Sequence, residues 1–293
     1  MKNAPVLHRL EYGLFTVLSR TLLLLPHEAA RGVGRGLGAL AWVLLRARRR
    51  VALDNLELAL PELPADERRR IARGSFHHLG RLTCDTVSSH RFDPVELCRR
   101  LTLAGWEHLE TARSRGRGVL VMSAHLGSWE MAAHPVGLYA EPMHVIGRPL
   151  DNPLLDQRLS GHRTRFGNAT IPKRGAARGS LRVLRRGGVV GILIDQRVRP
   201  EEGILVPFFG APAVTSPLLA RLALKTGAPI VPLFGHLAPG GTYRVEFQAP
   251  IEPLEGTGDE AVEELTRRCL ARVEEQIRAR PEHWLWLHRR WKR

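Results

Sequence analysis

Residues 118–130 read Gly-Val-Leu-Val-Met-Ser-Ala-His-Leu-Gly-Ser-Trp-Glu and decide the fold class of this chain. Val119–Met122 is a short, continuous apolar run, which is typical of a strand buried on both faces of a parallel sheet. Gly127 and Ser128 are small and allow a tight turn, and Trp129–Leu138 is predicted to follow as a helix. A buried strand that passes directly into a helix indicates an α/β protein.

The alternation of strands and helices continues toward the end of the chain. Short apolar runs predict further strands at His144–Gly147, Val189–Ile194, Pro229–Phe234 and Tyr243–Phe247. Further helices are predicted at Leu154–Phe166, Leu181–Arg186 and Leu218–Thr226, and residues 51–115 are predicted to be helical. Apolar residues spaced by three and four between Val262 and Ile277 predict a last amphipathic helix. We therefore predict one α/β domain over residues 51–293, with a mostly parallel central sheet flanked by helices.

Residues 1–50 form a separate region with a different pattern. Tyr12–Leu25 is apolar but contains Arg20, and it is shorter than the roughly 20 residues that a membrane-spanning helix needs. A second apolar stretch, Val33–Leu45, follows, and no convincing signal-peptide cleavage site comes after the first. Basic residues flank both stretches: Lys2, Arg9, Arg46, Arg48, Arg49 and Arg50. We predict membrane-associated helices that lie in or dip into a bilayer, with the basic residues on an anionic phospholipid surface. A single tilted span and two ordinary buried helices are the alternatives.

The charge of the chain indicates an anionic partner. Its 293 residues contain 44 Lys and Arg against 29 Asp and Glu, which gives a net charge of +15. Nucleic acid, a phospholipid surface and a phosphorylated substrate all fit this charge. The excess of arginine over lysine also fits the codon usage of a GC-rich genome. No zinc finger, aromatic RNA-binding motif or helix-turn-helix pattern is present, which argues against nucleic acid. Cys84, Cys98 and Cys269 are too widely spaced for a metal or disulfide pattern, and reduced thiols fit active parts that face the cytosol.

His125 and Glu130 are the candidate catalytic residues. They follow the Val119–Met122 strand at its carboxyl end, where open α/β sheets place their ligand sites. With four residues between them, the imidazole in the turn and the carboxylate in the first helical turn can approach each other. A carboxylate on one imidazole nitrogen fixes the tautomer, and the other nitrogen can then take a proton from a hydroxyl nucleophile near neutral pH. Neither a G-x-S-x-G hydrolase motif nor a phosphate-binding P-loop is present.

Three arginines and one aspartate are the candidate substrate-binding residues. Arg148, Arg163 and Arg165 can bind a phosphate through paired donors, or they can form a solvated basic helix face. Asp195 ends the Val189–Ile194 strand and can belong to the site or form a structural ion pair with Arg197.

Several apolar and aromatic segments have two interpretations. Val206–Phe209 and Pro212–Pro217 favour core or the wall of an apolar groove, and such a groove suits a hydrocarbon chain because each buried methylene contributes about 0.8 kcal/mol. Trp284, Trp286 and Trp291 fit either a membrane interface or C-terminal packing. A further group of histidines is predicted to be structural: His134, His144 and His162.

The His-x4-Glu motif after a short buried strand resembles the signature of the lysophospholipid acyltransferase superfamily, which is usually His-x4-Asp. The glutamate form and its surroundings resemble the lipid A late acyltransferases, the lauroyl and myristoyl transferases of lipopolysaccharide biosynthesis. Further segments resemble that family in the same order: Arg148-Pro-Leu-Asp-Asn-Pro-Leu, Gly187–Gln196, Val206–Gly210 with Ala213 and Thr215, and Pro281–Trp291. The resemblance covers roughly residues 40–293.

This resemblance implies a specific reaction. The donor would be an acyl carrier protein thioester, the acceptor a hydroxyl of a membrane glycolipid (a lipid A precursor), and no metal or organic cofactor would be required. His125 would be the general base and Glu130 its partner, while Arg163, with Arg165 as a neighbouring candidate, and Asp195 would also matter for activity. The expected location is the cytoplasmic face of the bacterial inner membrane.

Other functions remain as alternatives. The same superfamily includes lysophospholipid acyltransferases and the acyltransferases of phosphatidylinositol mannosides. The glutamate in the motif and the tryptophan-rich C-terminal segment favour a relationship outside the lysophospholipid branch, but they fit the mannoside branch. A basic protein that only binds membranes or nucleic acid would need neither the His125–Glu130 motif nor the arginines together with Asp195.

Overall fold

The computed structural model describes residues 4–147 and 149–291 of the chain. Its α-helices are α1 (Ala4–Leu24), α2 (His27–Leu44), α3 (Arg46–Ala59), α4 (Ala65–Ser88), α5 (Pro94–Arg100), α6 (Trp106–Ser114), α7 (Trp129–Ala132), α8 (His134–Tyr139), α9 (Pro153–Thr164), α10 (Ala176–Leu184), α11 (Leu218–Thr226) and α12 (Asp259–Ala279). Its strands are β1 (Leu101–Ala104), β2 (Val119–Ser123), β3 (Met143–Gly147), β4 (Ala169–Pro172), β5 (Val189–Leu193), β6 (Ile204–Phe208), β7 (Ala211–Thr215), β8 (Ile230–Leu237) and β9 (Tyr243–Phe247).

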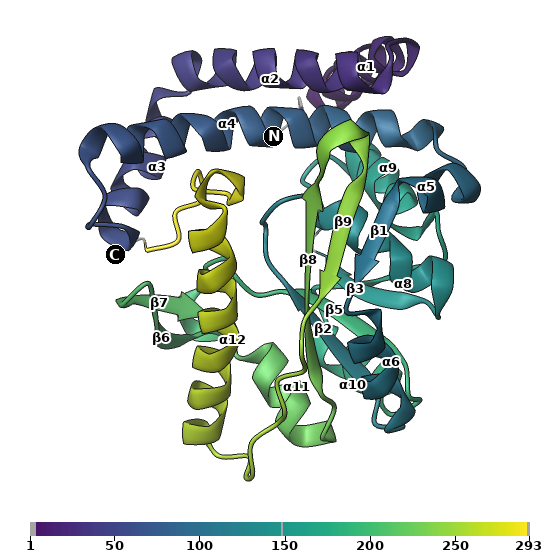
Figure 1. Cartoon of the computed structure of the whole chain (residues 1–293), viewed down its shortest axis with the longest axis vertical. Coiled ribbons are helices and arrows are strands. Elements are labelled where there is room, and N and C mark those ends of the chain that lie inside the picture. Colours follow the sequence, from purple (N-terminus) through teal and green to yellow (C-terminus); the bar gives the residue numbers. More distant parts are fainter. Residues whose placement is uncertain (1–3, 148, 292–293) are drawn as a thin grey trace.

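Within these described residues, seven strands form one sheet in the order β1-β9-β8-β2-β5-β3-β4, while β6 and β7 form a separate hairpin (Figure 1). Neighbouring strands of the sheet run parallel except for β8 and β9. The apolar strands β2 and β5 are adjacent near its centre, where helices cover both faces and continuous hydrophobic runs are expected. The predicted α/β fold, with a mostly parallel central sheet flanked by helices, is confirmed.

The strand register divides the central side chains between two faces. Val121 of β2 is paired with Gly191 of β5, which is paired in turn with Val145 of β3, so the three lie on one face. We call it the α7 face, because residues of α6, α7 and α8 complete the hydrophobic cluster there. Met122 and Ile192 lie on the opposite face, which we call the α11 face because α10, α11 and α12 pack against it.

The N-terminal helices form a layer across one end of the sheet. Figure 1 shows α1 and α2 stacked on the long helix α4, beyond the tip of the β8–β9 hairpin. The backbones of α2 and α4 approach closely, since a Cβ at Gly38 would lie 2.3 Å from the carbonyl oxygen of Phe76. Buried polar contacts join this layer to the sheet: Arg31 of α2 and Tyr243 of β9 both donate to Asp85 of α4, at 2.6 and 2.9 Å.

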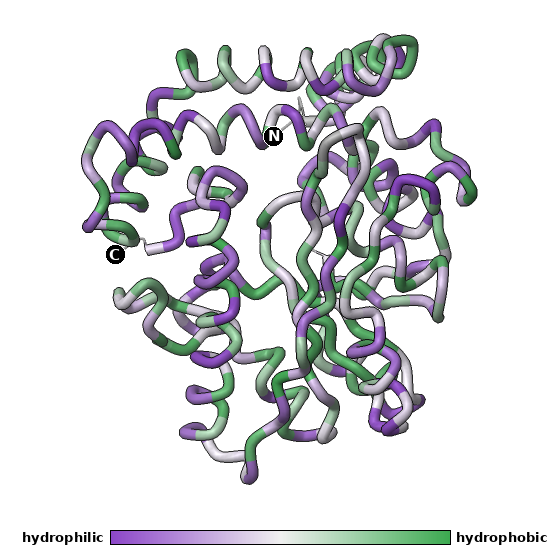
Figure 2. Tube along the Cα trace, viewed as in Figure 1, coloured by the Kyte–Doolittle hydropathy of each residue, from purple (hydrophilic) through white to green (hydrophobic). Residues whose placement is uncertain are grey.

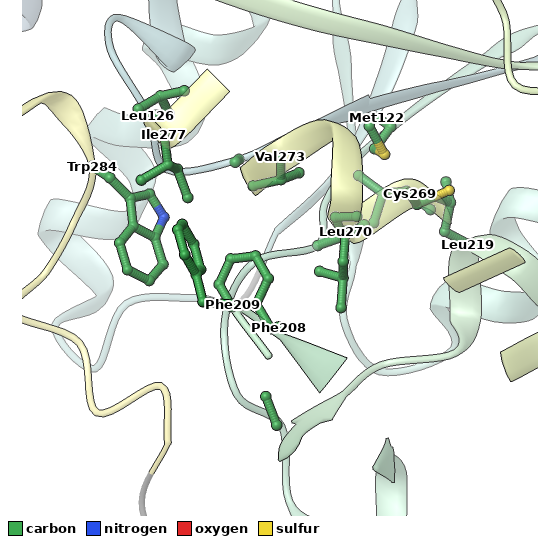
Figure 3. Packing of buried hydrophobic residues seen from close by; sticks show 14 of the residues in the cluster. Met122, Leu126, Phe208, Phe209, Leu219, Cys269, Leu270, Val273, Ile277 and Trp284 are labelled. Atoms are coloured by element: carbon green, nitrogen blue, oxygen red, sulfur yellow. The ribbon is translucent and has the colours of Figure 1, made fainter. Parts of the chain in front are cut away.

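The tryptophan-rich C-terminal segment packs inside the molecule. Trp284 and Trp286 are both buried, with their rings 4.6 Å apart, and Trp284 also contacts Phe208 of β6 (Figure 3). Val273 and Ile277 of α12 line the same cluster. Of the two interpretations of these tryptophans, packing is therefore the one that applies to Trp284 and Trp286.

Some predicted elements differ from those observed. Residues 51–115 are not entirely helical, because Leu101–Ala104 is the edge strand β1. The helix predicted over Trp129–Leu138 is divided at Ala133 into α7 and α8, and Pro135 lies in the first turn of α8. The edge strand β4 and the β6–β7 hairpin were not predicted, since short strands with mixed burial carry little periodicity.

Candidate active site

The loop that carries His125 leaves β2 at the carboxyl end of the sheet. Ser123 closes the strand, and its hydroxyl donates to the carbonyl of Leu233 in β8 at 2.6 Å. Gly127 has a φ of +61°, and a Cβ there would lie 2.1 Å from the carbonyl oxygen of Gly235, so only glycine fits. The next amide, that of Ser128, donates to the same carbonyl at 2.8 Å. The small residues of this turn thus allow the loop to lie directly against β8.

The carboxylate that contacts His125 is Asp195, which follows β5. Asp195 Oδ1 lies 2.9 Å from His125 Nδ1, and Oδ2 accepts from the His125 backbone amide at 3.0 Å and from the indole of Trp284 at 2.8 Å. Because an ionised carboxylate only accepts hydrogen bonds, Nδ1 carries the proton and Nε2 is left as the basic nitrogen. This is the arrangement that a histidine general base requires.

Electrostatics keep the Asp195 carboxyl ionised. Asp195 is 1% exposed, and burial alone would raise its pKa. The charge of His125 and the hydrogen bonds from His125 and Trp284 outweigh burial and hold the pKa below its ordinary value. Asp195 therefore acts as a fixed negative partner for the imidazole.

Glu130 has a different partner from the one predicted. Both of its oxygens accept from Arg163 of α9, at 3.0 Å from Nε and 2.6 Å from Nη2, in a bidentate ion pair. Burial raises the pKa of Glu130, but the hydrogen bonds and charge of Arg163 reverse this and lower it below its ordinary value. The predicted His125–Glu130 hydrogen bond is thus replaced by a Glu130–Arg163 pair and a His125–Asp195 pair.

The register of the sheet explains why Asp195 meets His125. Ser123 of β2 is directly paired with Leu193 of β5, and the two strands are parallel. His125 and Asp195 each lie two residues beyond this pair, so both residues follow their strands at the same edge of the sheet. Glu130 lies in α7, and its side chain contacts Arg163 of α9 instead.

These residues border one large cavity at the carboxyl edge of the sheet. The cavity has a volume of about 850 Å³, and His125, Glu130 and Arg163 line it together with Lys173 and Arg197. Most of its remaining wall is apolar. Within the described residues, no group of three or more His, Cys, Asp and Glu side chains is placed to bind a metal ion. The arrangement can bind an apolar chain beside a histidine base and several positive charges.

Comparison with known protein families assigns the chain. All of residues 1–293 match the family described as bacterial lipid A biosynthesis acyltransferase. The chain belongs to this family. It is therefore an acyltransferase enzyme, and the family to which the sequence was compared above is confirmed.

Individual relatives of this acyltransferase agree with the family assignment. The chain is 31% identical over 273 residues to the lipid A biosynthesis lauroyltransferase of Escherichia coli K12, covering 92% of this chain and 87% of the relative. It is 27% identical to the lipid A biosynthesis palmitoleoyltransferase of the same organism, over 92% of this chain and 86% of that protein. Among solved structures, the Thermotoga maritima LPA acyltransferase PlsC aligns with a TM-score of 0.39 and 15% identity, over 87% of this chain and 98% of that one.

The other predicted site residues of this acyltransferase lie in three different places. Arg163 lines the cavity, as predicted. Arg165 ends α9, donates to the carbonyl of His90 and stacks on Phe166, and it is not among the residues that line the cavity. Arg148 lies outside the described residues. Asp195 was predicted to bind substrate, but its contacts are with His125 and Trp284, and it does not reach the cavity wall.

Trp284 is a site residue that the motif did not identify. Its indole donates to Asp195. The backbones of Leu126 and Trp284 also form an isolated antiparallel β-bridge, which fixes the loop after His125. The amide of Gly127 also donates to the carbonyl of His283 at 3.0 Å. The Pro281–Trp291 segment was singled out by its resemblance to the family, but only the tertiary structure shows that it supports the loop that carries His125.

Proposed function

We propose that this acyltransferase moves a fatty acyl group from an acyl carrier protein thioester to a hydroxyl of a lipid A precursor, with His125 as general base. The observation that supports this most directly is the His125–Asp195 contact of 2.9 Å beside a large, mostly apolar cavity. The names of the relatives, all lipid A biosynthesis transferases, support the acceptor class. The resemblance of the motifs supports the carrier-protein donor.

The proposed reaction uses the two imidazole nitrogens in turn. Nε2 of His125 takes the proton of the acceptor hydroxyl as its oxygen attacks the thioester carbonyl carbon. Asp195 stabilises the imidazolium that forms, because its carboxylate accepts from Nδ1. The tetrahedral intermediate then expels the thiolate of the carrier, which takes the proton from Nε2. One ester bond replaces one thioester bond, and His125 returns to its neutral state.

Arg163 supplies fixed positive charge to the same step. Its guanidinium is held by Glu130 through two hydrogen bonds and lines the cavity. A cation that is positioned before the reaction stabilises negative charge without reorganisation, which suits an oxyanion or an acceptor phosphate. Glu130 in this proposal positions Arg163, and the loss of either side chain disturbs the other.

The N-terminal helices are proposed to attach the enzyme to the cytoplasmic face of the bacterial inner membrane. None of the helices within the described ranges is both long and apolar enough to cross a membrane. Large apolar side chains are nevertheless exposed on α1 and α2, which Figure 2 shows as hydrophobic stretches of the outer layer. They include Leu7, Leu10, Leu14, Val17, Leu40 and Val43. This pattern, with the basic start of α3, supports helices that lie in the membrane interface.

Acyl transfer by detergent-solubilised protein tests the proposal. Carrier-protein thioesters are offered with a lipid A precursor, a phosphatidylinositol mannoside or lysophosphatidic acid, and with matched His125→Ala and Glu130→Ala variants. We expect product on the lipid A precursor and a loss of about 100-fold to 10,000-fold in His125→Ala with the fold intact. Product on another acceptor would correct the acceptor class, and near-native turnover by His125→Ala would refute the general-base assignment.

A further inference from the structure

The cavity is lined by residues from both faces of the sheet, and we call the part of the cavity over each face an arm. Val121, Gly191 and Val145 lie on the α7 face, whereas Ile192 and Ile146 lie on the α11 face, yet all five line the same cavity. The two arms meet at the carboxyl ends of the strands, where His125 is also part of the wall. A substrate bound at His125 can therefore extend over either face.

Apolar and polar residues line different parts of the cavity. The arm over the α7 face is lined by buried apolar side chains such as Val121, Met143 and Leu233. A set of polar residues lines the cavity beyond the ends of β4, β5 and β7: Lys173, Gln196, Arg197, Glu202 and Ser216. Burial of polar groups against a hydrocarbon chain is unfavourable, so a fatty acyl chain is favoured in the α7-face arm.

Met143 lies farthest from the carboxyl edge among the strand residues that line the α7-face arm, because it pairs with Val189 of β5, two residues before Gly191. Gly191 lies in the interior of β5. A glycine inside a strand often marks a site that another group approaches closely. A Cβ added to Gly191 would lie 3.0 Å from the sulfur of Met143, so the methionine side chain lies over the glycine. Val121 and Gly191 precede His125 and Asp195 by four residues each. This places the end of the arm about 13 Å from the catalytic pair, from the rise of a strand.

We propose that the transferred acyl chain lies in the α7-face arm and that Met143, lying over Gly191, sets the longest chain that this enzyme accepts. The inference rests on the proposed function and adds a specificity-determining pair to it. The relatives are named for lauroyl, palmitoleoyl and myristoyl transfer, so the acyl group differs between members of the family. The polar wall beyond the strand ends is left for the polar part of a substrate.

Two substitutions shift the chain-length preference in opposite directions. Met143→Ala removes the end of the arm and favours longer acyl groups. Gly191→Ala displaces the flexible Met143 side chain into the arm and favours shorter ones. Each methylene that gains or loses its buried place changes kcat/KM by about fourfold.

The test measures kcat/KM for an even-numbered series of saturated acyl carrier protein thioesters with one acceptor. Met122→Ala is the matched control, because Met122 is equally buried but lies on the α11 face and does not line the cavity (Figure 3). Opposite shifts by Met143→Ala and Gly191→Ala, with the profile of Met122→Ala unchanged, are expected. Melting temperatures of all the variants separate lost stability from altered preference.

The possible outcomes separate this inference from the proposed function. If the unmodified enzyme transfers acyl groups but both variants keep its profile, the α7-face arm does not set chain length and the inference is wrong. The same shift in Met122→Ala as in Met143→Ala would also overturn it. If the unmodified enzyme shows no His125-dependent transfer from any donor, the proposed function fails instead.

Discussion

Two carboxylates at one edge of the sheet have different tasks because they have different partners. Asp195 is buried and Glu130 is largely buried beside the cavity, and in both the nearby positive charge holds the pKa below its ordinary value. Asp195, however, contacts a histidine, which gains and loses a proton near neutral pH, whereas Glu130 contacts an arginine, which stays charged. The first pair can change its charge during a reaction, and the second is a permanent ion pair that fixes a position.

The largest expected effect is that of Asp195→Asn. The amide has the size of the carboxylate, but it can donate a hydrogen bond to Nδ1 and so favour the wrong imidazole tautomer. We expect kcat to fall by about 10,000-fold with little change in KM. Steady-state kinetics checks this, with the exposed Asp54→Asn as a control for the loss of one negative charge. If Asp195→Asn retained a tenth of the native kcat, the division of tasks between the two carboxylates would be wrong.

A double-mutant cycle at Glu130 and Arg163 tests whether the second pair acts as a permanent ion pair. Glu130→Gln or Arg163→Gln leaves a buried charge without its partner, and we expect either to lower the free energy of unfolding by about 3 kcal/mol and kcat/KM by about 100-fold. The double variant should be more stable than either single variant but no more active. Urea unfolding and kinetics measure the two quantities. Additive effects on stability would show that the bidentate pair contributes nothing as a pair.

Trp284→Phe should lower kcat less, by weakening the support of the His125–Asp195 pair. The indole hydrogen bond contributes to the low pKa of Asp195, so its loss raises that pKa. Because this hydrogen bond also holds the carboxylate against His125, kcat at neutral pH should fall about tenfold. Trp286→Phe is the matched control, because that indole donates to the carbonyl of Pro281. A kcat of Trp284→Phe equal to that of Trp286→Phe would exclude the positioning role.

The smallest expected effect is on the pH dependence of the free energy of unfolding, and it concerns His134. Burial lowers the pKa of His134 to about 3, so it stays neutral in the folded protein while the unfolded chain takes up a proton near pH 6.5. Its contribution to stability is therefore complete above about pH 6.5 and is lost as the pH falls toward the folded pKa. His134→Phe should reduce this loss by about 1.4 kcal/mol per pH unit. Denaturant unfolding at several pH values tests this, and an unchanged slope would contradict it.

The fold was predictable from short-range patterns more completely than the site. Continuous apolar runs identified β2 and β5, and the motif after β2 placed His125 at the carboxyl edge of the sheet. The partner of His125 depends on strand order and register, which short-range periodicity does not encode. Once β2 and β5 are known to be adjacent, the pairing of Ser123 with Leu193 predicts that His125 and Asp195 meet. Spacing along the chain favoured Glu130 instead, and tertiary structure overruled it.

The N-terminal region shows the same limit. Apolar residues predicted helices in residues 1–50, and α1 and α2 are observed. Which of their side chains would be exposed depended on how they pack against α4, since Leu22 is buried while Leu14 is exposed on the same helix. The boundary at residue 50 and the attachment to a membrane both remain predictions.

The bridge between Leu126 and Trp284 has a consequence for protein synthesis. Trp284 comes 89 residues after Asp195 in the chain, and it completes both the hydrogen bonding of Asp195 and the support of the loop after His125. During synthesis, the last strand of the sheet, β9, therefore precedes the residue that donates to Asp195 and supports the loop after His125. The proposed site is complete only after translation has passed this tryptophan.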